Sequence, residues 1–357
     1  MFFFCVRFVC CLACALLGLF LAQPAQAAAR RMQPLPQRLS ETGLYLPGSA
    51  QIVNPAHIAF SPQYPLWSDG TRKRRWLSLP RGGTVDASRP DAWQFPVGTR
   101  LWKEFAYERA VETRYIERLR DGSWRFASYV WREDGSDADL APEAGLGAQP
   151  VPGDGTRRYD IPARSDCRAC HESAPSPVLG FSALQLSPDR DPLAPHADVL
   201  TSEASDLRTL QARGVLRNLP ASLLEAPPRI ASALPVERAA LGYLHGNCGH
   251  CHSDSRAGGS PVPVDIVLAQ SVSNGPAAVE RVRQSLRDVP GRFRHLAAMQ
   301  VVVAGDATRS TLVLRMGSRN PQLQMPPLGT RVPDREGLAL VSQWISHHLE
   351  PRKTLQP

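Results

Sequence analysis

Lysine is nearly absent from this 357-residue sequence: Lys73, Lys103 and Lys353 are the only three, although the formal net charge is +8. Arginine supplies almost all of the positive charge, and no basic-aromatic motif accompanies it. The composition therefore gives no support to nucleic-acid binding. The sequence also lacks a nucleophile elbow, a phosphate-binding loop and a metal-binding helix motif, so the commonest hydrolase and nucleotide-binding classes are not indicated. A basic surface is compatible with an acidic protein partner.

Cysteine is also absent from most of the chain. Four of the eight cysteines lie in the first 14 residues, and the other four form two short groups. Residues 1–27 contain an apolar stretch, Phe8–Ala22, followed by the A-x-A sequence Ala25–Ala27, which is typical of a cleaved secretory signal peptide. The apolar stretch is short for a membrane span, and no stop-transfer pattern follows it. We expect cleavage near Ala27 and a periplasmic protein with no transmembrane span in the mature chain; a retained N-terminal anchor is the alternative.

The four remaining cysteines all belong to Cys-x-x-Cys-His motifs. A structural zinc site needs four ligands, whereas each motif offers three and the two motifs are far apart in the chain. A thioredoxin-like redox pair would not require a histidine after each second cysteine. Cys-x-x-Cys-His is typical of c-type haem attachment, in which the cysteines bind the porphyrin and the histidine binds the iron. The sequence therefore predicts two covalently attached haem c groups, held by Cys167, Cys170 and His171 and by Cys248, Cys251 and His252.

Hydrophobic patterning predicts a β-rich N-terminal half. Three segments either have the two-residue alternation of a β-strand or are rich in aromatic and β-branched residues. They are Arg100–Glu108, Val111–Leu119 and Trp124–Trp131. The dipeptide Asp121-Gly122 between the last two is a strong signal for a tight hairpin. We therefore expect an antiparallel meander in which most of the tryptophans pack in the core.

The second half of the sequence has a helical pattern. Proline punctuates residues 189–235, where Ser205–Arg213 is the one expected helix; the later helices are expected from Val236 to the second motif, at Ala277–Leu286 and at Arg335–Leu349. We predict an α+β chain of two domains. These are a mainly antiparallel β domain with the first haem (28–188) and, after the linker (189–235), an all-α domain with the second haem (236–357).

Residues Val236–Leu349 resemble a class I cytochrome c. That family has a helix leading into Cys-x-x-Cys-His, a methionine on a late loop, and a C-terminal helix that crosses the first. The resemblance implies that Met325, in "LQMPPLGT", is the second iron ligand beside His252. Met316 and Met299 are the competing methionines. It also implies a close helix crossing, with Gly242 opposite an aromatic side chain such as Trp344.

The first half is similar to the β-sheet cytochromes of the cytochrome c′-beta type. The similarity is carried by "WQFPVGTRLWKEF" (Trp93–Phe105), "SWRFASYVW" (Ser123–Trp131) and the first haem motif. In hydroxylamine-oxidising relatives of that type a strand lysine is cross-linked to the haem, and Lys103 occupies the similar place here. The whole chain also resembles a group of uncharacterised bacterial dihaem c-type cytochromes, which share "LWSDG" (Leu66–Gly70), both motifs and a terminal Met-Pro.

Two haems in one exported chain predict electron transfer between periplasmic donor and acceptor proteins. The alternative is a haem enzyme or gas-binding protein whose first haem is open, because no methionine lies between Cys170 and Met299. His196 and His57 are the other possible ligands of that first iron. A non-haem metal or structural module is the third possibility.

Several charged residues of the β-rich half have a simpler expected role. Glu104 and Glu112 could act as acid or base near a haem, but carboxylates on strands are usually solvated. The basic run Arg72–Arg75 is likewise expected to be a solvated strand face.

Overall fold

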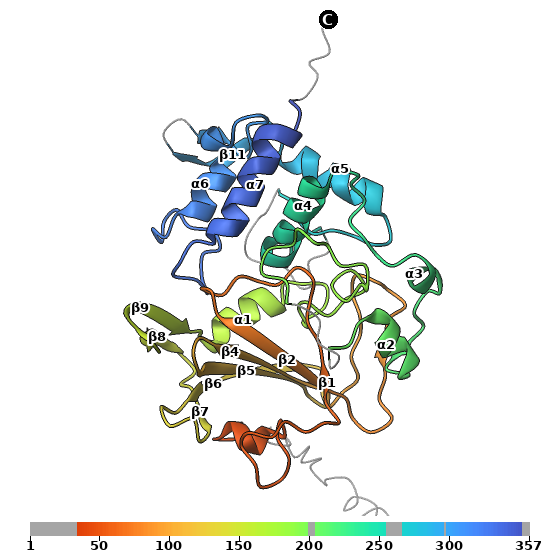
Figure 1. Cartoon of the computed structure of the whole chain (residues 1–357), viewed down its shortest axis with the longest axis vertical. Coiled ribbons are helices and arrows are strands. Elements are labelled where there is room, and N and C mark those ends of the chain that lie inside the picture. The colour runs from red at the N-terminus through yellow and green to blue at the C-terminus, as the bar shows by residue number, and fades with distance from the viewer. Residues whose placement is uncertain (1–33, 199–203, 255–265, 296–297, 352–357) are drawn as a thin grey trace, which may run out of the picture. The chain divides into compact units, whose positions relative to one another are not determined.

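The computed structural model contains an antiparallel six-stranded sheet in its N-terminal half (Figure 1). Neighbouring strands follow the order β1-β2-β4-β5-β6-β7. The predicted hairpin is confirmed, because Gly122 turns between β5 and β6 in the left-handed backbone region, with φ of 85°. The strands of this sheet are β1 (Ile58–Ala59), β2 (Arg72–Ser78), β4 (Arg100–Ala106), β5 (Ala110–Arg118), β6 (Trp124–Trp131) and β7 (Ala138–Leu140).

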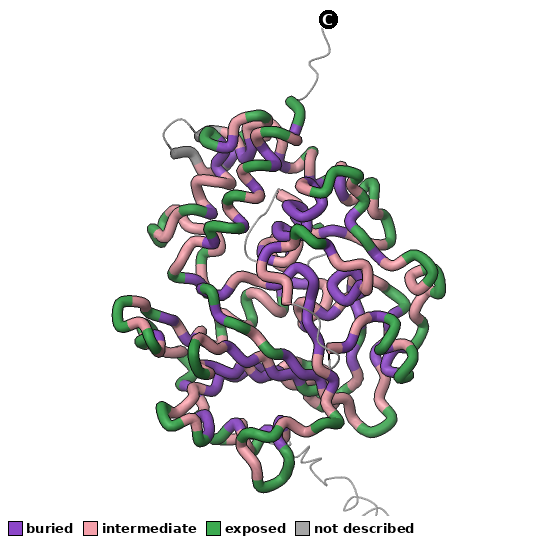
Figure 2. Tube along the Cα trace, viewed as in Figure 1, coloured by how far each residue is buried: buried purple, intermediate pink, exposed green. Residues whose placement is uncertain are grey.

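The two faces of the sheet pack against different parts of the chain. On one face the short helix η1 (Leu39–Thr42) covers an aromatic row, in which the Trp102 indole donates a hydrogen bond to Thr42. The other face is apolar at one end, where Leu101 and Ile116 are cross-strand partners. Helix α1 (Arg164–His171) packs on β6 at this end. Burial is concentrated along the central strands (Figure 2).

The region between the sheet and the later helices adds small elements to the sheet core. Leu207 and Leu210 of α2 (Leu207–Ala212) are fully buried in the apolar cluster of the sheet. The segment predicted as a linker therefore packs on the β-rich part. The remaining elements here are the β8 (Leu146–Val151) and β9 (Asp154–Ile161) hairpin, the parallel pair β3 (Val85–Asp86) and β10 (Leu216–Arg217), and α3 (Ser222–Glu225).

The C-terminal region is mainly helical and has its own apolar core. The predicted helices are present, and α7 packs against α4. This region is not all-α, because β11 and β12 form an antiparallel pair that the sequence pattern did not reveal. Its elements are α4 (Pro235–Cys248), α5 (Gly275–Leu286), β11 (Pro290–His295), β12 (Ala298–Gln300), η2 (Ala307–Arg309), α6 (Thr311–Gly317) and α7 (Arg335–His348).

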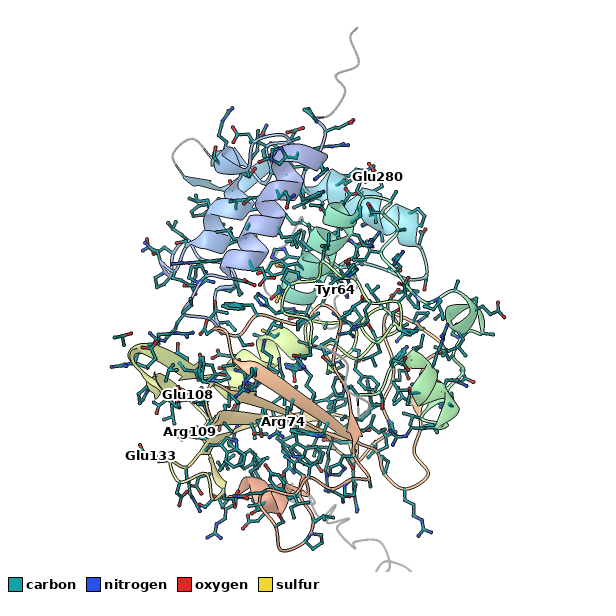
Figure 3. The ribbon with its side chains drawn as sticks, in the orientation of Figure 1. Tyr64, Arg74, Glu108, Arg109, Glu133 and Glu280 are labelled. Carbon is teal, nitrogen blue, oxygen red and sulfur yellow. The ribbon has the colours of Figure 1, made fainter. Side chains whose placement is uncertain are left out.

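Contrary to expectation, Gly242 of α4 does not face α7. A Cβ on Gly242 would lie 2.0 Å from the ring of Tyr64, which comes from the N-terminal half, so it is this ring that requires glycine. Figure 3 shows Tyr64 beside α4. Where α4 and α7 cross, the small residue is instead Gly337 of α7, where a Cβ would lie 2.2 Å from the Tyr243 ring. A glycine opposite an aromatic side chain thus does allow the close crossing, but the glycine belongs to the other helix.

The structure describes residues 34–198, 204–254, 266–295 and 298–351. The predicted signal peptide lies outside these ranges. Residues 36–357 belong to one compact unit. Among the described helices, none combines the length and the apolar character that crossing a membrane requires.

Candidate functional site

The first Cys-x-x-Cys-His motif lies on α1, against the apolar end of the sheet. The helix starts where the Asp166 carboxylate accepts a hydrogen bond from the backbone N–H of Ala163, at 3.0 Å. Cys167 packs on the apolar cluster of the sheet. The His171 ring lies 5.3 Å from the Phe126 ring, between ring centroids. The strands of the sheet therefore position this motif.

The imidazole of His171 is held in one orientation. Its Nδ1 donates to the carbonyl oxygen of Pro177 at 2.6 Å, which leaves Nε2 as the unprotonated nitrogen. Burial is the main cause that lowers the pKa of His171 to about 4; the charges of Lys103, His250 and Arg114 contribute, and the Pro177 carbonyl opposes them. The ring is therefore neutral near pH 7, which is the form that binds a metal ion.

The second motif begins at the last residue of α4. Pro235 occupies the first turn of this helix, where proline is well tolerated, and Cys248 ends it. The chain then turns so that the backbone N–H of His252 donates a hydrogen bond to the backbone carbonyl of Cys248 at 2.9 Å. Burial lowers the pKa of His252 and raises the pKa of the Cys248 thiol to about 12. This imidazole is also neutral, and this thiol is protonated.

The structure brings the two motifs together. The ligand atoms of Cys170, His250 and Cys251 all lie within 4.8 Å of one another. The Cys170 thiol donates a hydrogen bond to the Cys251 sulfur, which raises the pKa of Cys170 and lowers that of Cys251. The four described cysteines form no disulfide. His250, which is not one of the predicted ligands, thus belongs to the site; its place between the two cysteines of the second motif was the available signal.

A cleft of about 580 Å³ lies beside the meeting point of the motifs. One wall is the loop that follows the first motif, and the other includes His245 and His250 with part of α5. His245 Nδ1 accepts a hydrogen bond from the Gln270 N–H at 3.0 Å, and burial lowers the pKa of His245 to about 4. This histidine is therefore neutral and fixed in one tautomer.

The predicted methionine ligand lies on the loop after α6. Its backbone N–H donates to the carbonyl oxygen of Arg315 at 3.0 Å, and the Met325 side chain is half-buried. The charge of Arg315 adds a small contribution to the lowered pKa of His252, after burial of the ring. Met316 is buried in the helical core, and Met299 lies on β12. The pairing of Met325 with His252 stays a prediction.

The two histidines considered for the first iron have other partners. His57 donates to the Gly43 carbonyl at 2.8 Å and stacks on Trp102. It therefore lies on the face of the sheet opposite α1. His196 contacts both carboxylate oxygens of Asp334, at 2.9 and 3.0 Å. Neither position favours ligation of an iron beside His171.

The strand charges are more buried than expected. The side chains of Glu104 and Glu112 are 5% and 0% exposed, and each pairs with an arginine, Arg74 or Arg114. The expectation that these carboxylates are solvated was wrong, because each lies buried in the sheet with its charge paired to an arginine across or along a strand. The solvated description holds for Arg74, labelled in Figure 3, and for Arg72.

The remaining residues of the basic run turn inward. The Arg75 side chain is 5% exposed, and Lys73 is half-buried. Lys103 is also half-buried, with its ammonium group 4.8 Å from the centre of the Phe105 ring.

The "LWSDG" segment ties the two halves of the chain together. The Trp67 backbone N–H donates to the Asn247 side chain at 2.7 Å, next to Cys248, and the Trp67 indole donates to the Val332 carbonyl at 2.8 Å. The Asp69 carboxylate accepts from the backbone N–H groups of Arg331 and Val332 at 3.0 Å. In the sequence this segment served only as a mark of resemblance. In the structure its residues hold the second motif and the chain before α7 in place.

Comparison of the chain with protein-family models, with curated proteins and with solved structures finds no match.

Proposed function

We propose that this chain is a periplasmic dihaem c-type cytochrome that transfers electrons through two covalently bound haems. The observation that carries the proposal is the meeting of two Cys-x-x-Cys-His motifs that are about 80 residues apart in sequence. Cys170 of one motif and Cys251 of the other lie with their sulfur atoms within 4.8 Å. Cofactors anchored at neighbouring thiols are themselves neighbours, and electron transfer between redox centres requires a short distance.

The residues present suit haem attachment. His171 and His252 are both neutral, and the Pro177 carbonyl fixes the ring of His171 in the way that outer partners usually fix metal-bound histidines. None of the four thiols is used in a disulfide, so all four remain able to form thioethers. When bound, haem iron would supply one-electron redox chemistry.

The family resemblances give the finer form of the proposal. A helix that leads into the second motif, a later methionine and a C-terminal helix packed on the first are features of class I cytochrome c, and α4, Met325 and α7 correspond to them. The six-stranded sheet beside α1 corresponds to the β-sheet cytochromes of the cytochrome c′-beta type. Periplasmic redox proteins are the expected donor and acceptor.

A second candidate function is a haem enzyme or gas-binding protein with an open first haem. It is favoured by the surroundings of His171, where the charges that act on the ring come from Lys103, His250 and Arg114. The two histidines considered as its sixth ligand, His57 and His196, have other partners. The second haem would then exchange electrons with the first.

A third candidate is a single metal ion shared by the two motifs. Our expectation that the motifs lie too far apart for this was wrong, since Cys170, His250 and Cys251 form a set of sulfur and nitrogen donors that suits zinc. Such a site leaves the other four motif residues without a role, and a structural zinc ion normally takes a fourth ligand. We therefore place it behind haem.

Mass and spectroscopic measurements on one preparation of the purified protein distinguish these three candidates. Native mass spectrometry should show two added haem masses, and the visible spectrum should survive acid-acetone extraction because the haems are covalent. A protein with zinc and no haem would overturn the cytochrome proposal. Carbon monoxide binding to the reduced protein, together with a high-spin paramagnetic signal when it is oxidised, would favour the open first haem over simple electron transfer.

A further inference from the structure

A row of basic side chains crosses the face of the sheet that carries α1. Lys103 on β4 is the direct cross-strand partner of Arg75 on β2 and of Arg114 on β5. All three share a face with Leu101 and Ile116, because side chains two positions apart on a strand point the same way. Like charges directly opposite on neighbouring strands are destabilising. A row of this kind needs compensating negative charge.

The described residues compensate only part of the row. Arg114 is held by both oxygens of Glu112, at 2.9 and 3.1 Å. Arg75 contacts Asp198 at 3.4 Å. Among the described residues, Lys103 has no carboxylate within hydrogen-bonding distance, and its closest partner is the Phe105 ring.

Lys73 lies on the same face of β2 as Arg75 and extends the row. Its hydrogen-bond acceptor is a neutral group. It donates to the carbonyl oxygen of Leu66 at 3.0 Å. Among the described residues, the four basic side chains of this row therefore meet two carboxylates, Glu112 and Asp198.

A cavity opens at one end of the row. Its volume is about 200 Å³, and Lys73 and Arg75 line it together with Arg72, Trp67, His196 and Asp198. Asp198 is the one carboxylate among these lining residues, and it also accepts a hydrogen bond from Ser61 at 2.6 Å. The space is far larger than a single water needs, and Arg72, Lys73 and Arg75 line it against one carboxylate. These are the properties of a site for a small anion.

We propose that Lys73, Arg75, Lys103 and Arg114 form an anion-binding site on the sheet beside His171, for a carboxylate or a small inorganic oxyanion. Two sources of this chemistry are possible. One is a propionate of the first haem, which rests on the proposed function, and the other is a free oxyanion that enters the cavity. Burial of Lys103 and its cationic neighbours lower its pKa, so an added anion would relieve a repulsion that the fold maintains.

The test uses the purified full-length holoprotein and isothermal titration with inorganic phosphate at low ionic strength. Lys103→Gln and Lys73→Gln remove cations of the row, and Arg81→Gln removes an exposed arginine as a charge-matched control. If the anion is free, phosphate binds once per chain, and each lysine variant weakens it about tenfold or more. The control leaves the affinity unchanged. Phosphate should also raise the thermal midpoint of the natural protein more than that of Lys103→Gln.

If the anion is a propionate, phosphate does not bind to the holoprotein. Lys103→Gln and Lys73→Gln then shift the reduction potential of one haem, whereas Arg81→Gln shifts neither. Absence of both phosphate binding and a potential shift would overturn the site, with circular dichroism confirming that the variants fold. Failure of the haem proposal would be visible separately as missing haem mass, and the phosphate titration would still decide the free-anion case.

Discussion

The two Cys-x-x-Cys-His motifs have the same ligands and very different surroundings. The first lies on a short helix against a sheet, where His171 is fixed by Pro177 and approached by basic side chains. The second ends a 14-residue helix within a separate apolar core, with a methionine on a nearby loop. An identical motif can therefore serve two sites whose second ligand and electrostatics differ. The surroundings, more than the motif, would set the redox behaviour of each site.

The largest expected effect comes from removing one motif at a time. Cys248→Ala with Cys251→Ala should leave a protein with one haem, and so should Cys167→Ala with Cys170→Ala. The two products should differ in their visible and paramagnetic spectra, since each retains a different iron. Mass spectrometry of the intact protein counts the haems. Loss of both haems from either double variant would mean that the two sites are not independent. The contrast between the sheet site and the helical site would then not hold.

The next effect concerns the methionine that only the second site is expected to use. Oxidised protein should show the weak near-infrared band of an iron–thioether bond, and Met325→Ala should abolish it. The reduction potential of that haem should fall, because methionine ligation raises it. Met316→Ala is the matched control, since Met316 is buried in the core. A band that survives Met325→Ala and disappears in the control would transfer the ligand to Met316.

The helical site depends on a carboxylate that is buried in its own core. Glu237 is 1% exposed and accepts from Ser232 at 2.5 Å, from Arg283 at 2.9 Å and from the Trp344 indole at 3.2 Å. Glu237→Gln should lower the free energy of unfolding by about 2 kcal/mol in urea titrations near neutral pH. Glu280→Gln, on a partly exposed carboxylate that also contacts Arg283, should cost under about 0.5 kcal/mol.

This carboxylate also predicts a pH dependence. Burial acts to raise the pKa of Glu237, but the hydrogen bonds from Arg283 and Ser232 prevail and leave it lowered. A carboxyl group whose pKa is lowered by folding stabilises the protein at pH values above its pKa in the unfolded chain, about 4.3. This stability is lost as the pH falls through the pKa of the folded protein. Unfolding free energies measured between pH 6 and 3 should decline less steeply in Glu237→Gln. An equal slope in both proteins would contradict this assignment.

The smallest expected effect is at the sheet. The Tyr159 hydroxyl donates to Glu112 at 2.6 Å, and Glu112 in turn holds Arg114 in the basic row. Tyr159→Phe should cost about 1–2 kcal/mol, because the bond is made to a charged acceptor. Tyr107→Phe is the comparison, since that hydroxyl meets only a neutral carbonyl, of Asp69, at 3.2 Å. Equal losses in urea titrations would show that the charge of Glu112 is unimportant there.

Local patterns predicted the elements of the fold well. The strand β6 and the helix α7 lie within a residue of their predicted ends, because alternation and a helical apolar stripe are properties of neighbouring residues. The α1 helix and the β11–β12 pair were missed. The α1 segment is short and has no buried apolar stripe. The strand β12 has only three residues, and β11, with the sequence PGRFRH, has no apolar alternation.

The candidate site was predictable as a set of residues but not as an arrangement. Each motif contains its expected ligands within five residues, whereas the approach of Cys170 to Cys251 depends on contacts between segments far apart in the chain. Burial of Arg75 and Glu112 likewise follows from what packs on the sheet, which no pattern along one strand contains.

The tryptophan of "LWSDG" has a consequence for how the chain reaches this state. Its two hydrogen bonds join residues that are 180 and 265 positions apart in sequence. Contacts of such long range close slowly, because the loop entropy must be overcome before they form. We therefore expect the turn at Cys248 to remain open for a time after the helices have formed. That interval would let an attachment enzyme reach the second motif before Trp67 locks it.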